Sequence, residues 1–289
     1  MEISEDRKHW ERTTQERKLE RFYGTGAERY INFHDGYLNF GFWEDGVTDY
    51  VAAAENLVWH LAKLCGVSAD SRVLDVACGM GTQDIFIYRQ FRPEQIDGLD
   101  VTWKHIEHGR RRARLADCED RVHFHHGTAI DLPFSEGAFS QVISIEGPVH
   151  FNTREQFMRE AFRVLKPSGV LGLSDYVMKR PPKTLLERIL IESARRLWKI
   201  PRENVDSTAN YKMKLERSGF HNVKVEEVGE QVIPGYYYEQ MRPETRKAIA
   251  EIRGAMAARG TVIIDVAAFQ AFKRGLIEYV FVTAEKPAG

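Results

Sequence analysis

Short apolar runs alternate with amphipathic stretches along most of the chain from about residue 48. The apolar runs are typical of buried strands, and the stretches between them show the three- and four-residue spacing of helices. The predicted strands of this part span residues 72–77, 95–101, 121–127, 140–146 and 170–177. Helices are predicted after a cap at Thr48, at 82–91 and 102–118, and after a capping box formed by Thr153 and Gln156.

The pattern changes in the last third of the chain. After Pro181 and Pro182 we expect helices at 184–199 and just before 217–220, a strand at 222–228, a helical region at 242–274 and a last strand at 278–286. We therefore expect three parts. These are an N-terminal lid at 1–47, a ligand-binding core at 48–180, and helical cap segments with the last two strands of the core sheet at 181–289.

Strands that alternate with helices predict an α/β fold. Parallel neighbours need long crossover connections, which the predicted helices supply. We expect a Rossmann-like, doubly wound sheet of seven mostly parallel strands, with the N-terminal lid and the helical insertion forming a roof over the active site. Ligands then bind at the carboxyl ends of the strands.

The balance of charges narrows the choice of partners. The 289 residues include 41 basic and 42 acidic ones, so the molecule has no net field that attracts nucleic acid or an anionic membrane. No stretch is apolar enough to span a membrane, the N-terminus has no signal-peptide pattern, and the three cysteines are far apart. We expect a cytoplasmic protein with a small-molecule substrate and no nucleic-acid partner, and leave a homodimer open.

The stretch VLDVACGMGTQ, residues 73–83, joins the first predicted strand to a helix through two glycines. Such a turn lets a ligand approach the backbone and aims helix N–H groups at it. A dinucleotide site requires a third glycine where this chain has Asp84, a carboxylate close to the expected pyrophosphate. Asp75 and the carbonyls at the strand end instead suit a ligand with an ammonium group.

The same stretch resembles the first motif of the class I S-adenosylmethionine-dependent methyltransferases, and IDGLDVT, residues 96–102, is similar to their second-strand motif. The resemblance covers residues 48–178 and the last strand. It implies S-adenosylmethionine as cofactor, S-adenosylhomocysteine as product, and an Asp100 that binds both ribose hydroxyls, as one carboxylate can. The expected cofactor-binding residues are Asp75, Ala77, Gly79, Gly81, Gln83, Asp100, Val101, Thr128, Ala129, Ile130, Glu146 and Tyr30.

One position departs from the family pattern. The stretch at 127–151 is similar to a family segment in which an acid usually contacts adenine, but this chain has Thr128 there. We expect the Thr128 hydroxyl, or the backbone near Ala129 and Ile130, to take that role.

The N-terminal stretch YLNFGFWEDG, residues 37–46, looks like the lid of small-molecule methyltransferases of the natural-product, sugar, macrolide and quinone types. The likeness implies that Tyr30, Tyr37 and Trp43 close over the methionine end of the cofactor and over the substrate. Aromatic loops of this kind commonly shape an apolar pocket.

Methyl transfer from a sulfonium to a hydroxyl requires an aligned attack and the removal of a proton. His150 follows the fourth predicted strand and Asp175 lies near the end of the fifth, so we expect a His–Asp pair with His150 as general base. Some sugar O-methyltransferases of the family have a similar arrangement. Glu146, at the end of the fourth strand, is the third candidate catalytic residue; it faces substrate or cofactor, or has a structural role.

Other patterns have simpler explanations. His123 and His125 share one face of a strand without further ligands nearby, so we expect no metal site there. The basic run at 109–114 is followed by acids and is typical of a solvated helix face. Three consecutive tyrosines at 236–238 either line a pocket or pack within the roof.

The expected function is transfer of a methyl group to a small-molecule acceptor, most simply a hydroxyl oxygen. The alternatives are N- or C-methylation of a small metabolite and a non-catalytic S-adenosylmethionine-binding protein. A nicotinamide-dependent oxidoreductase is a further alternative, which Asp84 disfavours.

Overall fold

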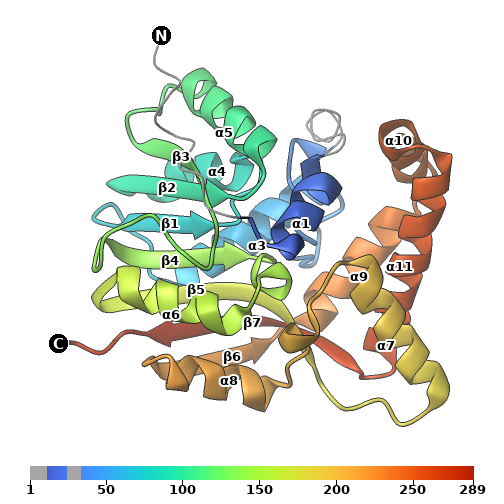
Figure 1. Ribbon diagram of the computed structural model, residues 1–289. Coiled ribbons are helices and arrows are strands. Elements are labelled where there is room, and N and C mark those ends of the chain that lie inside the picture. The colour runs from blue at the N-terminus through green and yellow to red at the C-terminus, as the bar shows by residue number, and fades with distance from the viewer. Residues whose placement is uncertain (1–11, 25–33) are drawn as a thin grey trace.

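The computed structural model describes residues 12–24 and 34–289 and contains a seven-stranded sheet (Figure 1). The strand order is β3-β2-β1-β4-β5-β7-β6, and within this sheet β7 runs antiparallel to both of its neighbours. The predicted α/β fold with seven mostly parallel strands is therefore confirmed. The strands are β1 (Arg72–Val76), β2 (Gln95–Asp100), β3 (Val122–His126), β4 (Phe139–Ile145), β5 (Leu165–Met178), β6 (His221–Glu227) and β7 (Ile277–Glu285).

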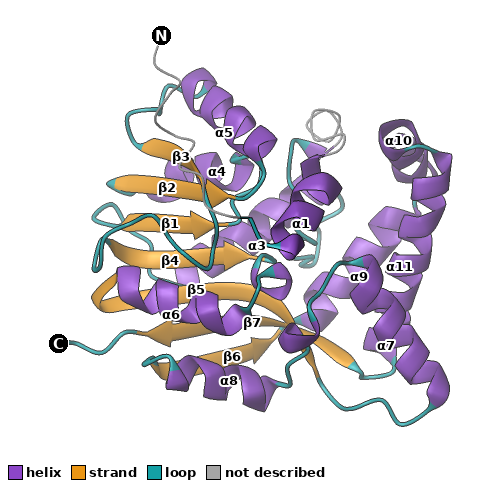
Figure 2. Ribbon diagram, viewed as in Figure 1, coloured by secondary structure: helices purple, strands orange, loops and turns teal. Residues whose placement is uncertain are grey.

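Helices cover both faces of the sheet (Figure 2). One face is covered by α3 (Tyr50–Leu64), α4 (Thr82–Phe91) and α5 (Trp103–Leu115), the other by α6 (Arg154–Val164) and α8 (Thr208–Arg217). Side chains of β1 alternate between the two resulting cores: Val73 packs on the α3 side, and Leu74 and Val76 pack on the α6 side. This two-sided burial explains why the strand is apolar at consecutive positions.

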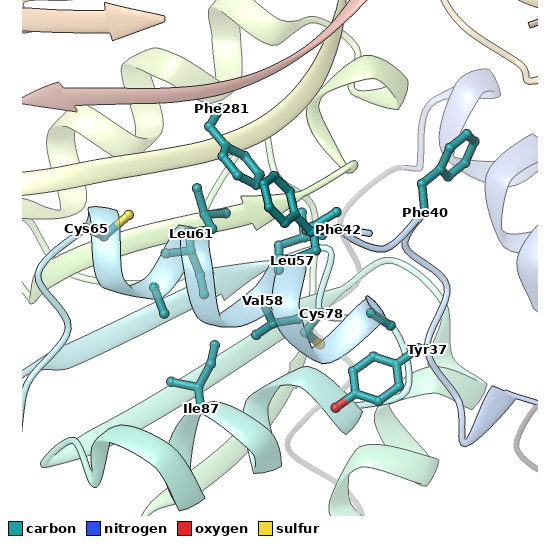
Figure 3. Close-up of a cluster of buried hydrophobic side chains, with 14 of the residues drawn as sticks. Tyr37, Phe40, Phe42, Leu57, Val58, Leu61, Cys65, Cys78, Ile87 and Phe281 are labelled. Carbon is teal, nitrogen blue, oxygen red and sulfur yellow. The ribbon is translucent and has the colours of Figure 1, made fainter. Parts of the chain in front are cut away.

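Helix α3 fills the centre of its face of the sheet (Figure 3). Leu57, Val58 and Leu61 are fully buried there, beside Phe281 from β7. The helix begins after Asp49, whose side chain accepts a hydrogen bond from the backbone of Ala52, and not after the predicted cap Thr48. Asp49 is one residue closer to the first helical turn and is as good a cap as threonine.

Helices α7 (Leu185–Leu197), α9 (Gly229–Met241), α10 (Pro243–Arg253) and α11 (Ala255–Lys273) pack together beyond the carboxyl ends of the parallel strands, and α1 (Thr14–Gly24) lies between them and the sheet (Figure 1). Two short 3-10 turns, η1 (Pro148–His150) and η2 (Arg202–Asn204), lie beside the same strand ends. Helix α9 is absent from the sequence prediction because Pro234 and Gly235 interrupt its helical pattern. A Cβ at Gly235 would lie 2.2 Å from the Trp43 indole, so the glycine admits that ring.

No helix in residues 12–24 and 34–289 is long and apolar enough to cross a membrane. The same residues contain no group of three or more His, Cys, Asp and Glu side chains placed to hold a metal ion. His125 instead bonds to Asp97 on the neighbouring strand.

Gly172, in β5, lies where the sheet packs tightly against the end of α3. A Cβ at this position would lie 1.9 Å from Cys65 Sγ. We predict that Gly172→Ala lowers the free energy of unfolding by about 1–3 kcal/mol, because an added methyl in a filled core forces its neighbours apart. Urea denaturation measures the change.

Two further variants control this experiment. Gly260→Ala, in α11, places a methyl in open space and should leave stability equal or slightly higher. Adding Cys65→Ala to Gly172→Ala removes the clashing sulfur and should restore part of the loss. Equal destabilisation by both single glycine variants would contradict the packing argument.

Candidate active site

A cavity of about 250 Å³ lies at the carboxyl ends of β1, β2 and β4. Its floor is formed by the turns that follow these strands, and one wall by α1. The loop at 34–40 and the roof helices α9 to α11 close the remaining sides. The cavity is therefore at the position that the sheet topology predicts for a ligand.

The glycine turn predicted after β1 is present, and its backbone is left-handed at three positions. Ala77, Gly79 and Gly81 have φ values of 67°, 57° and 75°, all in the left-handed region. Ala77 and Gly79 line the cavity, but Gly81 does not. A Cβ at Gly81 would lie 2.5 Å from the ring of Phe124, so this glycine permits close packing of α4 and the expected ligand contact is corrected to a packing role.

Asp100 ties the end of β2 to this turn. Its Oδ2 accepts a hydrogen bond from Gly79 N at 3.1 Å, and its Oδ1 accepts one from Thr102 N at 2.7 Å. Burial alone would raise the pKa of Asp100, but nearby His105 and the two backbone donors lower it. Asp100 and the adjacent Val101 both line the cavity, so an ionised carboxylate faces the ligand space.

Asp75 lies behind the cavity wall. It is fully buried and accepts a hydrogen bond from Gln83 Nε2, and of the two residues only Gln83 lines the cavity. The expected direct contact of Asp75 with a ligand is therefore corrected to an indirect one. Burial raises the pKa of both Asp75 and its fully buried neighbour Asp84, so the two carboxyls favour a shared proton over two charges.

The turn after β3 forms the far end of the cavity. Thr128, Ala129 and Ile130 all line it. The Thr128 hydroxyl donates a hydrogen bond to the carboxylate of Glu16, which α1 brings in from the other side. The sequence analysis did not identify Glu16, because its segment was interpreted only as rich in charge. The available signal was the three-residue spacing of Thr13 and Glu16, which is typical of a capping box.

Glu146 occupies the end of β4 with a left-handed φ of 56°. Its Oε1 accepts hydrogen bonds from Phe40 N and from the Tyr279 hydroxyl, each at 2.8 Å. Burial raises the pKa of Glu146 to about 8, so the side chain is largely protonated at neutral pH. Glu146 lines the cavity and also links the loop at 34–40 to β7.

His150, at the end of η1, lines the cavity and is half-buried. Its Nε2 is 2.9 Å from the hydroxyl of Tyr23 on α1. Among the described residues Nδ1 has no hydrogen-bond partner. Burial, and secondarily the charge of Arg154, lowers the pKa of His150 to about 4, so the imidazole is neutral at physiological pH.

The predicted His150–Asp175 pair is wrong. Asp175 is fully buried, does not line the cavity, and forms a two-pronged ion pair with Arg154 at 2.8 and 2.9 Å. The Tyr211 hydroxyl donates a further hydrogen bond to it at 3.0 Å. Arg154 lies close enough in the fold to take the carboxylate, and a guanidinium satisfies it better than an imidazole would.

Aromatic side chains surround the space next to His150. Phe40 stacks on Tyr236 with 3.7 Å between ring centroids, and Tyr176 and Trp198 meet Phe40 edge to face. These four residues line the cavity, as does Tyr37. Trp43 packs against Gly235 of α9 instead, and Tyr30 lies outside the described residues.

Comparisons with known proteins agree with this geometry. Residues 73–169 match the family described as a methyltransferase domain. The chain is 33% identical over 222 residues to the erythromycin 3''-O-methyltransferase of Saccharopolyspora erythraea. The aligned region covers 73% of this chain and 71% of that enzyme.

Two solved structures have the same fold over nearly the whole chain. The geranyl diphosphate C-methyltransferase of Streptomyces coelicolor A3(2), solved with S-adenosyl-L-homocysteine, is 16% identical with a TM-score of 0.74, and 95% of this chain and 98% of that one are covered. The [4+2]-cyclase SpnF is 24% identical with a TM-score of 0.76, and the match covers 96% of this chain and 97% of SpnF.

The family match begins in β1 and extends through the glycine turn, Asp100 and the turn after β3, which together form the floor of the cavity. The similarity to the erythromycin 3''-O-methyltransferase extends over 73% of the chain, well beyond that domain. The chain therefore belongs to the class I S-adenosylmethionine-dependent methyltransferases, in the branch that acts on small molecules.

Proposed function

We propose that this methyltransferase transfers its methyl group to a hydroxyl oxygen of a small, partly apolar metabolite, with His150 as general base. The observation that carries the proposal is the position of His150 on the wall of the cavity that the glycine turn and the aromatic side chains also line. Burial lowers the pKa of His150, so its imidazole is neutral and able to take a proton. The 33% identical relative named for O-methylation supports an oxygen acceptor.

The residues present fit the cofactor of the family. Asp100 is ionised and able to accept from two ribose hydroxyls, and Thr128, Ala129 and Ile130 provide the adenine end. Gly79 has no side chain to fill the turn, and Gln83 and the Ala77 backbone remain for the amino-acid end. When bound, S-adenosylmethionine supplies an activated methyl group on a positively charged sulfur.

The acceptor side of the cavity suits an apolar molecule with one reactive group. Phe40, Tyr176, Trp198 and Tyr236 offer ring faces and edges, and the Tyr176 hydroxyl has no hydrogen-bond partner among the described residues. His150 Nε2 lies 2.9 Å from the Tyr23 hydroxyl, so a proton removed from the substrate can pass to the imidazole, which Tyr23 holds at the cavity wall. In the described part of the chain, no carboxylate bonds to His150 to stabilise the resulting imidazolium.

The lowered pKa of His150 makes it a weak base, which favours a second candidate function, methyl transfer to carbon or nitrogen. Neither acceptor needs a strong base at the moment of attack. The ring faces around the cavity would stabilise positive charge that develops on a methylated alkene or amine. The geranyl diphosphate C-methyltransferase shares this fold.

Incubation with isotopically labelled S-adenosylmethionine tests the proposal directly. Hydroxylated macrolides, sugars, quinols, amines and prenyl compounds serve as acceptors, and NMR of the product locates the label on oxygen, nitrogen or carbon. Label on oxygen supports the proposal and label on carbon or nitrogen supports the second function. Binding of S-adenosylhomocysteine without transfer to any acceptor class would favour a non-catalytic binding protein.

We predict that Asp100→Asn weakens binding of S-adenosylhomocysteine by about 10- to 100-fold. The amide keeps the shape but loses the charge that strengthens two hydrogen bonds. Isothermal titration calorimetry measures the affinity. Asp97→Asn is the matched control, because Asp97 is buried on the same strand but lies outside the cavity. Equal losses in both variants would mean that Asp100 acts through the fold.

His150→Ala should lower kcat for an oxygen acceptor by roughly 100-fold or more, since proton removal loses its base. The affinity for S-adenosylhomocysteine should stay within about threefold, because the change lies away from Asp100. Single-turnover kinetics and calorimetry separate the two effects. His221→Ala, an exposed histidine of β6, is the control and should change neither. An unchanged kcat in His150→Ala would refute the base.

The pH profile of kcat/KM provides an independent check. His150 acts as a base only while neutral, and this form is lost as the pH falls through its pKa of about 4. We predict a rate that is level from about pH 5 to 7 and falls about tenfold per pH unit below about 4. Circular dichroism at each pH confirms that the fold persists. An acidic limb near 6.5 that disappears in His150→Ala would contradict the lowered pKa.

A further inference from the structure

Glu16 is a carboxylate that α1 places at the end of the cavity formed by the turn after β3. It is only 7% exposed, and it lines the cavity together with Thr128, Ala129 and Ile130. Glu16 precedes the core segment, and Thr128 lies 112 positions further along the chain. Their contact exists only because α1 packs across the carboxyl edge of the sheet.

The two oxygens of Glu16 have different partners. Oε2 accepts a hydrogen bond from Thr13 N at 2.7 Å, and the Thr13 hydroxyl accepts one from Glu16 N at 3.2 Å. This reciprocal pair is a capping box at the start of α1. Oε1 points the other way and accepts from the Thr128 hydroxyl, so the cap alone does not explain a buried acid in the cavity wall.

Of Thr128 and Glu16, only Glu16 has spare capacity to accept a hydrogen bond from a ligand. The Thr128 hydroxyl gives its single proton to Glu16, and its oxygen lies 3.3 Å from Ile130 N, which donates to it. A carboxylate has about four lone-pair sites, of which the contacts above use two. Glu16 therefore retains the capacity to accept a further N–H from a ligand in the cavity.

We propose that Glu16 accepts a hydrogen bond from the exocyclic amino group of the cofactor adenine, in place of the acid that this chain lacks at Thr128. This inference rests on the cofactor placement of the proposed function. Glu16 is then a nucleobase-specificity residue: its carboxylate attracts an amino group and repels a carbonyl oxygen at the same ring position. Thr128 orients the carboxylate and does not itself read the base.

The proposal links adenine recognition to the catalytic histidine. Tyr23 lies seven residues after Glu16 on α1, about 10 Å along the helix axis, and its hydroxyl contacts His150. Gln15, next to Glu16, donates hydrogen bonds to the backbone carbonyls of Lys199 and, at 3.3 Å, His150. One helix thus contacts the adenine end, the base and the segment after α7.

The test compares S-adenosylhomocysteine with S-inosylhomocysteine, whose base has a carbonyl where adenine has the amino group. Calorimetry gives both affinities for the wild type, Glu16→Gln and Glu20→Gln. Glutamine at the third helical position preserves the capping box, so α1 is expected to remain folded. Glu20→Gln makes the same charge change one turn later on α1, where Glu20 pairs with Arg12 and does not line the cavity.

We expect the wild type and Glu20→Gln to bind S-adenosylhomocysteine at least about tenfold more tightly than the inosine analogue. In Glu16→Gln this ratio should fall about tenfold or more, because an amide N–H can donate to the carbonyl of the analogue. A ratio unchanged from the wild type overturns the proposal, even where both affinities fall. Because binding is measured without a methyl acceptor, failure of the O-methylation proposal would leave this result intact.

Discussion

The buried ion pair of Arg154 and Asp175 determines how the turn that carries His150 is held at the cavity. Both side chains are fully buried, and removing either partner would leave an uncompensated charge at a cost of about 3–5 kcal/mol. Arg154 also donates a hydrogen bond to the Asn204 carbonyl, and the Asn204 side chain donates to the carbonyls of Pro148 and Val149. The turn that ends in His150 is thus held by this network, whose positive member also disfavours the imidazolium.

The two ends of the cavity use opposite electrostatics. At the cofactor end Asp100 stays charged because backbone N–H groups and His105 stabilise the anion. On the side proposed for the acceptor, burial keeps His150 uncharged at neutral pH, and it also keeps Glu146 largely protonated. A positively charged ligand is therefore attracted to the side of Asp100, and an apolar molecule suits the side of His150. This asymmetry is consistent with a cationic methyl donor and a small, partly apolar metabolite.

The features that the sequence predicts correctly are those that depend on a short stretch of neighbouring residues. The strands, the glycine turn and the acid at the end of β2 follow from apolar runs, glycine spacing and position, and each lies where the sequence places it. The His150–Asp175 pair fails because strand position brings two residues to one edge but does not choose their partners, and Arg154 competes for the carboxylate. Glu16 and α9 were missed because a long-range contact and a proline-containing helix leave little periodic signal.

Helix α1 connects the turn after β3 to the turn that carries His150. Glu16 bonds to Thr128, Gln15 to the carbonyl of Lys199, and Tyr23 to His150, so the helix contacts three segments that are distant in sequence. A shift of α1 that broke one of these contacts would strain the other two, because a helix of 11 residues moves as a rigid body. On the roles proposed above, a ligand that engages Glu16 also favours the position of Tyr23 beside His150, so proton removal is best prepared when the cofactor site is filled.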